Sequence, residues 1–435
     1  MRTPALALSI FLVLLVPATH AIQWPWDRDT PAPSATPKAA ITPKRAVAPT
    51  PAQPIQAQPK PTPRPGIRWP WLRDTSTPSP NSAKARAQAE AEFKVPLRST
   101  LSGADEVARF LAGMPLPKNS SLIPLTNTPA WQEHAAFFEK TFAKMNVKQL
   151  LRLHNWETQY LPESREKIPV AFYMFSGPDF LYVDQVFPKA DIYILCGKEA
   201  MGPPPDPKRI SNLGGALHNL EEAMHSSLRF SFFITKDMRV SLDSQELKGV
   251  LPILYVFLAR ADKSIRDVTY GSLSDSGAFL EGRSGSNPGV RIRYVNNRTG
   301  QEQTLYYFNT DISDGGLASS GFLRFCNQFG VGCSLLKASS YLMFEGGFNR
   351  IRDFVLDHSK TIVQDDSGIP ISSFNPQKWN IRVFGHYVGP IEIFKQHYQP
   401  KLKEIFDQIS PPPITFHFGY RYNYTQSHVI VASRR

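Results

Sequence analysis

Cysteine is scarce in this chain, with 3 Cys among 435 residues. So few cysteines exclude a small disulfide-stabilised fold, and a chain of this length can bury a large apolar core instead. Charged residues make up 20% of the sequence and aromatic residues 11%, which excludes disorder along the whole length. Apolar packing must therefore hold the fold together.

Motifs that specify a reaction are also lacking. The sequence has no Gly-x-Ser-x-Gly elbow, no Walker loop and no four-ligand zinc cluster. His218, Glu221, Glu222 and His225 share one helical face, but an apolar opposite face makes an ordinary amphipathic helix the simpler interpretation. The sequence therefore indicates compartment and architecture better than chemistry.

Long apolar runs are confined to the N-terminus. Arg2 precedes an apolar run at residues 6–16, and small residues follow at 19–21, the order and length of a signal peptide. We expect residues 1–21 to be cleaved after Ala21, leaving a periplasmic or secreted protein, of a bacterial type, without a transmembrane span. No Cys precedes Cys196, which excludes a lipid-anchored N-terminus. The alternative is that the segment stays uncleaved as an anchor.

Residues 22–92 are expected to form a disordered, basic linker. Fifteen of the 39 prolines lie between residues 25 and 80, which favours extended polyproline II structure over helix or sheet. Residues 22–86 hold ten Lys or Arg against three Asp, a net charge of +7. With Arg2 also set aside, only +4 of the formal +12 belongs to residues 87–435. The charge therefore points to an anionic envelope component or envelope protein as partner, and no nucleic acid is expected.

The linker contains a repeated aromatic box. Residues 22–30 and 67–75 each carry a Trp-Pro-Trp unit, which places Trp24, Trp26, Trp69 and Trp71 in matching positions. Two rings on a stiff backbone are typical of docking motifs. Duplication during linker expansion, or rings folded back on the globular part, would explain the repeat equally well.

The rest of the chain divides into a helical segment at residues 93–165 and an α/β domain at 166–435. Thr128 and Pro129 predict a helix start, followed by apolar residues at helical spacing. Strands are expected at 168–175, 190–196, 289–295, 303–308, 361–364, 380–384, 414–422 and 428–432. Helices are expected at 213–232, 244–260, 321–329, 335–344, 348–356 and 391–408. Residues 296–300, Asn-Asn-Arg-Thr-Gly, predict a β-hairpin between two strands.

This alternation predicts an α/β fold with a mixed, mainly parallel sheet of Rossmann-like order, an antiparallel hairpin and a closing antiparallel strand pair. Such a closing pair resembles the Rossmann-like methyltransferase architecture, in the order of elements only. The turn after the first strand, Ser176-Gly177-Pro178-Asp179, lacks the glycine spacing that lets a nucleotide approach the backbone. No nucleotide cofactor is therefore expected, and the resemblance implies no activity here.

Acidic residues follow most of the expected strands. Because ligands of open α/β sheets bind beyond the carboxyl ends of strands, these residues would border one crevice. Candidate catalytic residues are Asp311, Asp365, Asp366 and His386. Candidate ligand-binding residues are Ser176, Asp179, Glu199, Asp314, Ser367 and Tyr387.

Each of these residues alone is also explained by turn chemistry, since Asp, Ser and Gly are favoured in turns. Together, the carboxylates would suit a divalent cation or an acid/base pair. The preferred function is an exported ligand-binding or envelope-interaction protein with an acidic crevice. The alternative is a metal-assisted or acid/base hydrolase acting on an envelope or extracellular substrate.

The cysteines give one further expectation. Cys326 and Cys333 are separated by six residues that include two glycines, so a disulfide between them is expected in an oxidising compartment. Cys196, inside an apolar strand, is expected to be a buried thiol.

Overall fold

The computed structural model describes residues 102–233, 246–283 and 285–435. The expected signal peptide, the Pro-rich linker and both Trp-Pro-Trp boxes lie outside the described residues. All described residues belong to one unit of the chain, Pro78–Arg435.

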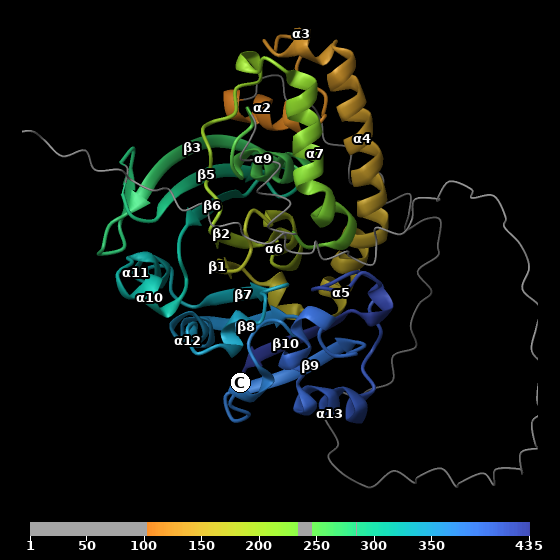
Figure 1. Ribbon diagram of the computed structural model, residues 1–435, viewed down its shortest axis with the longest axis vertical. Helices are drawn as coiled ribbons and strands as arrows, with labels where there is room; N and C mark the ends of the chain where they lie inside the picture. Colours follow the sequence, from red (N-terminus) through yellow and green to blue (C-terminus); the bar gives the residue numbers. More distant parts are fainter. Residues whose placement is uncertain (1–101, 234–245, 284) are drawn as a thin grey trace, which may run out of the picture. The chain divides into compact units, whose positions relative to one another are not determined.

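A ten-stranded mixed sheet runs through the described part of the chain, in the order β4-β3-β5-β6-β2-β1-β7-β8-β10-β9 (Figure 1). The strands are β1 Ile168–Tyr173, β2 Ala190–Gly197, β3 Lys263–Leu273, β4 Phe279–Glu281, β5 Pro288–Asn296, β6 Glu302–Asn309, β7 Gly332–Leu336, β8 Ser359–Gln364, β9 Trp379–Gly385 and β10 His428–Arg434. The five central strands, β6 to β8 in this order, are parallel to one another.

Antiparallel strands extend the sheet on both sides of this parallel centre. On one side β5, β3 and β4 are added in antiparallel pairs, and on the other β10 lies antiparallel between β8 and β9. Of the nine strand pairs among the described residues, four are parallel and five antiparallel. The α/β class is confirmed, but the expectation of a mainly parallel sheet is wrong, because β3 and β4 carried no recognised strand signal.

The predicted hairpin is confirmed between β5 and β6. Val295 pairs with Glu302, and the turn closes with the Asn296 N–H donating to the Gln301 carbonyl at 2.9 Å. Gly300 has φ +71°, the left-handed region that glycine enters without steric cost.

Helices cover both faces of the sheet. Side chains alternate along β1: Ala171 and Tyr173 belong to one core cluster, and Val170 and Phe172 to the other. The first face packs against α2 Gly103–Leu111, α3 Ile123–Thr126, α4 Pro129–Met145, α5 Leu151–Tyr160, α6 Phe180–Val186, α7 Leu213–Phe230 and α9 Leu251–Arg260. The second packs against α10 Asp314–Ala318, α11 Phe322–Asn327, α12 Asn349–His358 and α13 Pro400–Ile409.

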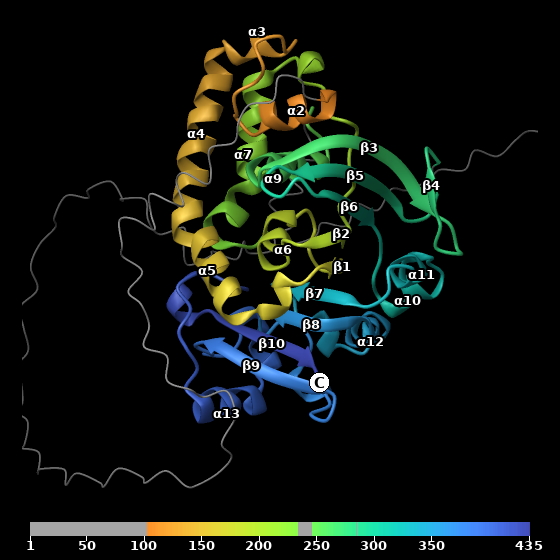
Figure 2. The ribbon, with the colours of Figure 1, turned by 180° about the vertical axis from the view of Figure 1, so that it is seen from behind.

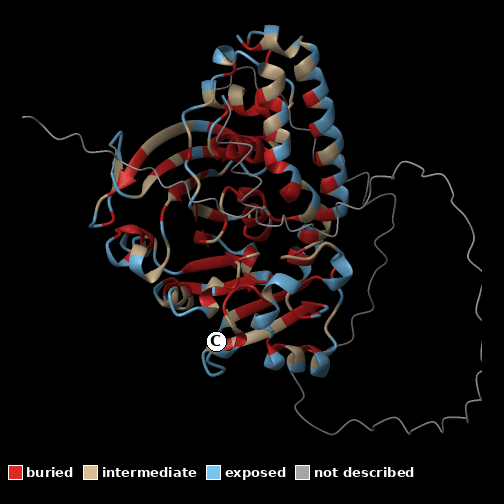
Figure 3. Ribbon diagram, in the orientation of Figure 1, coloured by how far each residue is buried: buried red, intermediate tan, exposed pale blue. Residues whose placement is uncertain are grey.

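The helices that precede β1 share the core of the sheet. Helix α4 packs against α7, and α2 packs against α9 (Figure 2). Nine of the ten residues of α9 are buried, and Figure 3 shows this helix enclosed by the surrounding elements. The Thr128 side chain caps α4 as predicted, accepting from the Trp131 N–H.

The helix predicted at residues 244–260 begins only at Leu251, and three further predicted elements are wrong in type or extent. Residues 335–344 were expected to be helical, but Leu335 and Leu336 lie in β7 between β1 and β8, where an apolar run does not reveal its period. Residues 391–408 form a 3-10 turn, Glu392–His397, and then α13, because Pro400 begins a new helix.

The third error concerns residues 414–422. Phe416 and Phe418 are buried in alternation, as in a strand. Backbone groups of this segment bond to side chains instead of to a neighbouring strand. The His417 N–H donates to Gln149, and the Phe418 N–H donates to Ser427. The closing antiparallel strand β10 therefore pairs with β8 and β9, not with this segment.

Candidate functional site

A cavity of about 350 Å³ lies at the carboxyl ends of β1, β2, β6 and β7. Its walls come from the loop after each strand: residues 174–179, 197–199, 310–312 and 337–340. From β1 the chain goes to β2 and on to β3, β4 and β5 at one edge of the sheet, comes back to β6 beside β2, and then crosses to β7 on the other side of β1. This reversal is where open α/β sheets form ligand crevices, since loops on its two sides leave the sheet in opposite directions.

Glu199 and Asp311 bring carboxylates to this cavity from β2 and β6. Glu199 is half-buried, with its Oε2 3.4 Å from the Tyr307 hydroxyl. Asp311 forms an ion pair with Lys198 at 2.9 Å. A hydrogen bond from the Ser313 N–H, with the Lys198 ammonium, lowers the pKa of Asp311 to about 2, so this carboxylate stays ionised.

Asp179 and Lys337 form a buried ion pair in the cavity wall. Lys337 Nζ lies 2.9 Å from Asp179 Oδ2, and both side chains are at most 3% exposed. Burial raises the pKa of Asp179, and Lys337 and the Tyr173 hydroxyl act in the opposite direction. The Lys337 ammonium also lies 4.1 Å from the centre of the Tyr182 ring.

Lys337 also contacts the C-terminal end of α7, which is followed by aromatic residues of the cavity lining. Its ammonium donates to the carbonyl of Ser231, the residue that ends α7 in a left-handed conformation. Phe232 and Phe233 follow directly and line the cavity, together with Phe348. The cavity is thus lined by both polar and aromatic residues, as most small-molecule sites are.

The loop after β7 has an unusual backbone. Ala338, Ser340 and Tyr341 all have φ between +54° and +56°, although none is glycine. Such conformations are costly for residues with a Cβ and persist only where surrounding contacts enforce them. The hydroxyl of Ser339, in the same loop, is buried and has no hydrogen-bond partner among the described residues.

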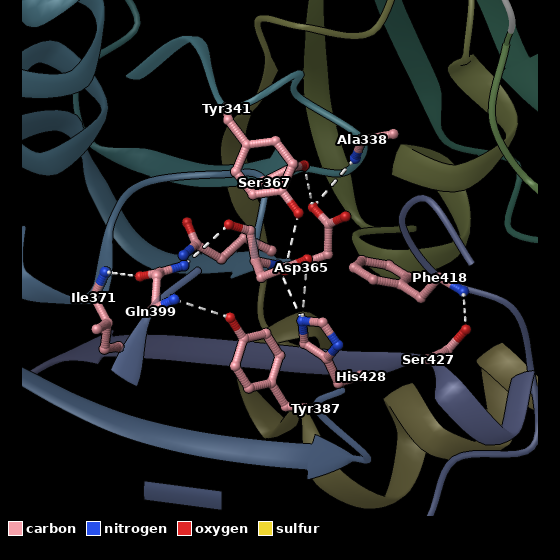
Figure 4. A network of polar contacts seen from close by, with 12 residues as sticks. Ala338, Tyr341, Asp365, Ser367, Ile371, Tyr387, Gln399, Phe418, Ser427 and His428 are labelled. Atoms are coloured by element: carbon pink, nitrogen blue, oxygen red, sulfur yellow. Dashed lines mark hydrogen bonds and ion pairs between the residues drawn. The ribbon is translucent and has the colours of Figure 1, made fainter. Parts of the chain in front are cut away.

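Asp365 binds this loop without lining the cavity itself (Figure 4). Its Oδ1 accepts from the Ala338 N–H at 3.2 Å and from the Ser367 hydroxyl at 2.6 Å. Ser367 in turn accepts from the N–H groups of Ser339 and Tyr341, through its hydroxyl and its carbonyl. Asp365 and Ser367 thus support the cavity wall and do not line the cavity.

Asp366 is also buried, on the side of β10. Its Oδ2 accepts from the Tyr341 hydroxyl at 2.9 Å, and its backbone N–H donates to His428 Nε2 at 3.0 Å. His428 is therefore the neutral tautomer with its proton on Nδ1, and burial lowers its pKa to about 4. Burial raises the pKa of Asp365 and of Asp366 to about 6.

The remaining candidates lie elsewhere. Asp314 accepts from the Arg350 N–H at 2.7 Å at the start of α12, an ordinary capping role. His386 and Tyr387 line a second cavity next to α13, with Asp407 and Ser410. Tyr387 also accepts from the backbone N–H of Gln399 (Figure 4).

The residues predicted to border one acidic crevice therefore lie in separate places. Ser176, Asp179, Glu199 and Asp311 line one cavity. Asp365, Asp366 and Ser367 form a buried network behind it. Among the described residues, no direct contact joins Asp311 or Asp314 to Asp365, because Lys198 and Arg350 provide their partners.

The expected disulfide is not formed. Cys196, Cys326 and Cys333 are all free, buried thiols. Cys326 precedes β7 and packs in the same core cluster as Cys196, while Cys333 lies in β7 and packs on the opposite face of the sheet. Two thiols on opposite sides of a sheet cannot meet without moving the strand. The prediction of Cys196 as a buried thiol is confirmed.

Sequence reasoning missed Lys337, Ser339, Tyr341 and His428. The first three stand after β7, which was mistaken for a helix, so their position at a strand end was hidden. Had Leu335 been assigned to a strand, Lys337-Ala338-Ser339-Ser340 would have been the fourth loop at the crevice.

In the ranges that the structure describes, no three His, Cys, Asp or Glu side chains are arranged to hold a metal ion. In the same ranges, no helix has both the length and the apolar composition needed to cross a membrane. The chain matches no protein-family model, and no curated protein or solved structure shows significant similarity to it.

Proposed function

We propose that this chain is a small-molecule-binding protein whose ligand occupies the cavity at the carboxyl ends of β1, β2, β6 and β7. The observation that carries the proposal is the position of this cavity, at the reversal of strand order in the parallel centre of the mixed sheet. A Rossmann-like relationship to the methyltransferase architecture is part of the proposal. It is supported by the order β6-β2-β1-β7-β8-β10-β9 with β10 antiparallel.

Glu199 is the residue proposed to orient the ligand. It stands at the end of β2, 22 positions after Gly177, and its Oε2 lies within 3.7 Å of the point where a Cβ of Gly177 would be. A carboxylate in this position of such folds accepts hydrogen bonds from a vicinal diol. Within the described residues, Asp179 and Asp311 pair with lysines, whereas no Lys or Arg forms an ion pair with Glu199.

The charges also restrict the ligand class. Lys198 and Lys337 also line the cavity, but they pair with Asp311 and Asp179, so Glu199 is the lining carboxylate that forms no ion pair with Lys or Arg among the described residues. The loop after β1 has no glycine-rich cradle for a phosphate, so a phosphorylated ligand is disfavoured. An uncharged or cationic diol, in a nucleoside or a sugar of an envelope glycan, is the ligand chemistry that these residues favour.

Calorimetric titration of the purified chain tests this proposal. The probes are adenosine against 2′-deoxyadenosine, and methyl α-mannopyranoside against its 2-deoxy analogue. A diol compound of one pair is expected to bind, with its deoxy partner and the Glu199→Gln variant weaker by about ten- to a hundredfold. Glu222→Gln, an exposed change of the same kind, is the control. Equal binding of diol and deoxy compounds would overturn the role of Glu199.

We also propose that the mature chain is exported and that its basic, Trp-containing segment binds an anionic envelope component. The signal-like order of residues 1–21 and the net charge of residues 22–86 support this. N-terminal sequencing of exported material is expected to begin at Ile22. Recovery of intact Met1 in a membrane fraction would favour the anchor instead.

A further inference from the structure

The conformation of the loop 337–341 depends on a buried carboxyl pair. Three of its residues have left-handed backbones without being glycine, and three of its N–H groups donate to Asp365 or Ser367. An N–H donor bound to a carboxylate forms a stronger hydrogen bond than one bound to a neutral oxygen. The charge on Asp365 therefore supports a strained cavity wall.

The neighbouring carboxyl group of Asp366 binds the loop through one oxygen, since its Oδ2 accepts from the Tyr341 hydroxyl at 2.9 Å. Its Oδ1 lies 3.5 Å from His428 Nε2, and that nitrogen already accepts the Asp366 N–H, so both atoms are acceptors. A proton on Asp366 Oδ1 would remove the repulsion between these two acceptors. Because His428 is neutral, it brings no positive charge to the two carboxyls.

Few charges reach the pair from the elements packed around it. The titratable and charged groups that face the pair or His428 are Tyr173 from β1, Tyr341 from the loop after β7, His386 and Tyr387 after β9, and Tyr420 and Arg421 before β10. Arg421 is the one Lys or Arg among them. Two ionised carboxylates here would be adjacent and desolvated, which is unfavourable.

We propose that Asp365 and Asp366 form a proton-dependent latch: while the pair retains one proton, the loop 337–341 is held as a wall of the cavity, and loss of that proton releases it. The direction follows from linkage. Burial raises the pKa of both carboxyls to about 6, and a released loop would expose them to water at an ordinary pKa. The held state thus binds the proton more tightly, so acid favours it and rising pH opposes it.

Hydrogen exchange of the full chain at pH 5 to 8 tests the latch. The quantity compared is the protection factor of peptides covering residues 337–341, which is the intrinsic exchange rate at each pH divided by the observed rate. In the wild type it is expected to fall by about tenfold or more between pH 5 and pH 8. Asp366→Asn, which cannot lose a proton, is expected to keep the pH 5 protection at pH 8.

Tyr420→Phe is the matched control, since the Tyr420 hydroxyl donates to the Ala338 carbonyl at 2.7 Å. It should lower protection at every pH and leave the pH dependence unchanged. Peptides from α9 report global unfolding and should stay protected throughout. The latch is refuted by constant wild-type protection, by a parallel loss in α9, or by an equal loss in Asp366→Asn.

Discussion

Single residues around the cavity show how charge is matched inside this protein. Lys337 pairs with Asp179 Oδ2, and Lys263 pairs with Asp184 at 2.9 Å with both side chains under 5% exposed. A buried pair of this kind adds little net stability when complete, but an unpaired survivor is costly. The cavity wall therefore depends on both members of the Asp179–Lys337 pair.

Replacing Lys337 with Met tests this dependence. The variant leaves Asp179 buried without its cation, and its free energy of unfolding is expected to fall by about 3–5 kcal/mol in urea denaturation. The double variant Asp179→Asn/Lys337→Met should recover much of that loss. Arg209→Met, which breaks the exposed pair with Asp206, is the control and should change stability by about 1 kcal/mol or less.

The carboxyl pair also predicts a pH dependence of global stability. Because the folded-state pKa of Asp365 and Asp366 is about 6, above the unfolded value of about 4, their contribution is complete below pH 4 and is lost as pH rises through 6. His428, with its pKa lowered to about 4, contributes oppositely and loses its contribution as pH falls from about 6.5 to 4.

Asp366→Asn should therefore be more stable than the wild type at pH 8, by about 1–3 kcal/mol, and the difference should shrink towards pH 4. Urea denaturation at a series of pH values measures this. Asp353→Asn, a change of the same kind at a side chain 63% exposed, is the control. A constant difference from pH 4 to 8 would mean that the titration of Asp366 does not affect stability.

At the scale of elements, side chains fix where helices and loops begin. The Thr128 hydroxyl oxygen accepts from the Trp131 N–H at 3.3 Å, and Pro129 occupies the first helical position. Thr128→Ala removes this acceptor, so thermal or urea unfolding should show a loss of about 1 kcal/mol. Thr128→Ser keeps the oxygen and should stay close to the wild type. Equal losses in both variants would assign the effect to the methyl group.

Elements with strong local signals were predictable from the sequence. The cap at Thr128, the hairpin turn at Gly300 and most strands of the parallel centre were predicted because local chemistry determines them. Strand β7 was not, since the apolar run around Leu335 fits a helix or a buried strand equally well. The strand predicted at residues 414–422 is wrong for another reason: the side chains of Gln149, which is distant in sequence, and of Ser427 accept hydrogen bonds that a neighbouring strand would otherwise accept.

The candidate site was predictable only residue by residue. Glu199 and Asp311 were expected at one crevice because both follow strands, and the structure places both in the lining of one cavity. The separation of Asp365 from that crevice depends on the path of the loop 337–341, whose left-handed residues are not glycines and so carry no sequence signal. Pairing across the sheet, as between Asp179 and Lys337, likewise has no local signature.

At the scale of the whole molecule, the N-terminal helix α2 belongs to the core of the α/β unit. Asp105 Oδ1 accepts from the Ile265 N–H at 2.7 Å, and the Ser102 hydroxyl donates to the Ile265 carbonyl at 2.5 Å. Phe110 and Leu111 are completely buried among the elements of the first face. Helix α2 thus completes a core that the sheet and α9 leave open on this side.

Thermal unfolding of three chains, 22–435, 93–435 and 112–435, tests this assignment. Removal of residues 22–92 should leave the midpoint within about 2 °C, because the contacts of α2 are retained. Further removal to residue 111 deletes Phe110 and Leu111, each worth about 2–5 kcal/mol when buried. That loss approaches the total stability of an ordinary domain, about 5–15 kcal/mol, so the shortest chain should unfold far below the others or fail to fold. If it unfolds at the same temperature as 93–435, α2 is an appendage and the core is complete without it.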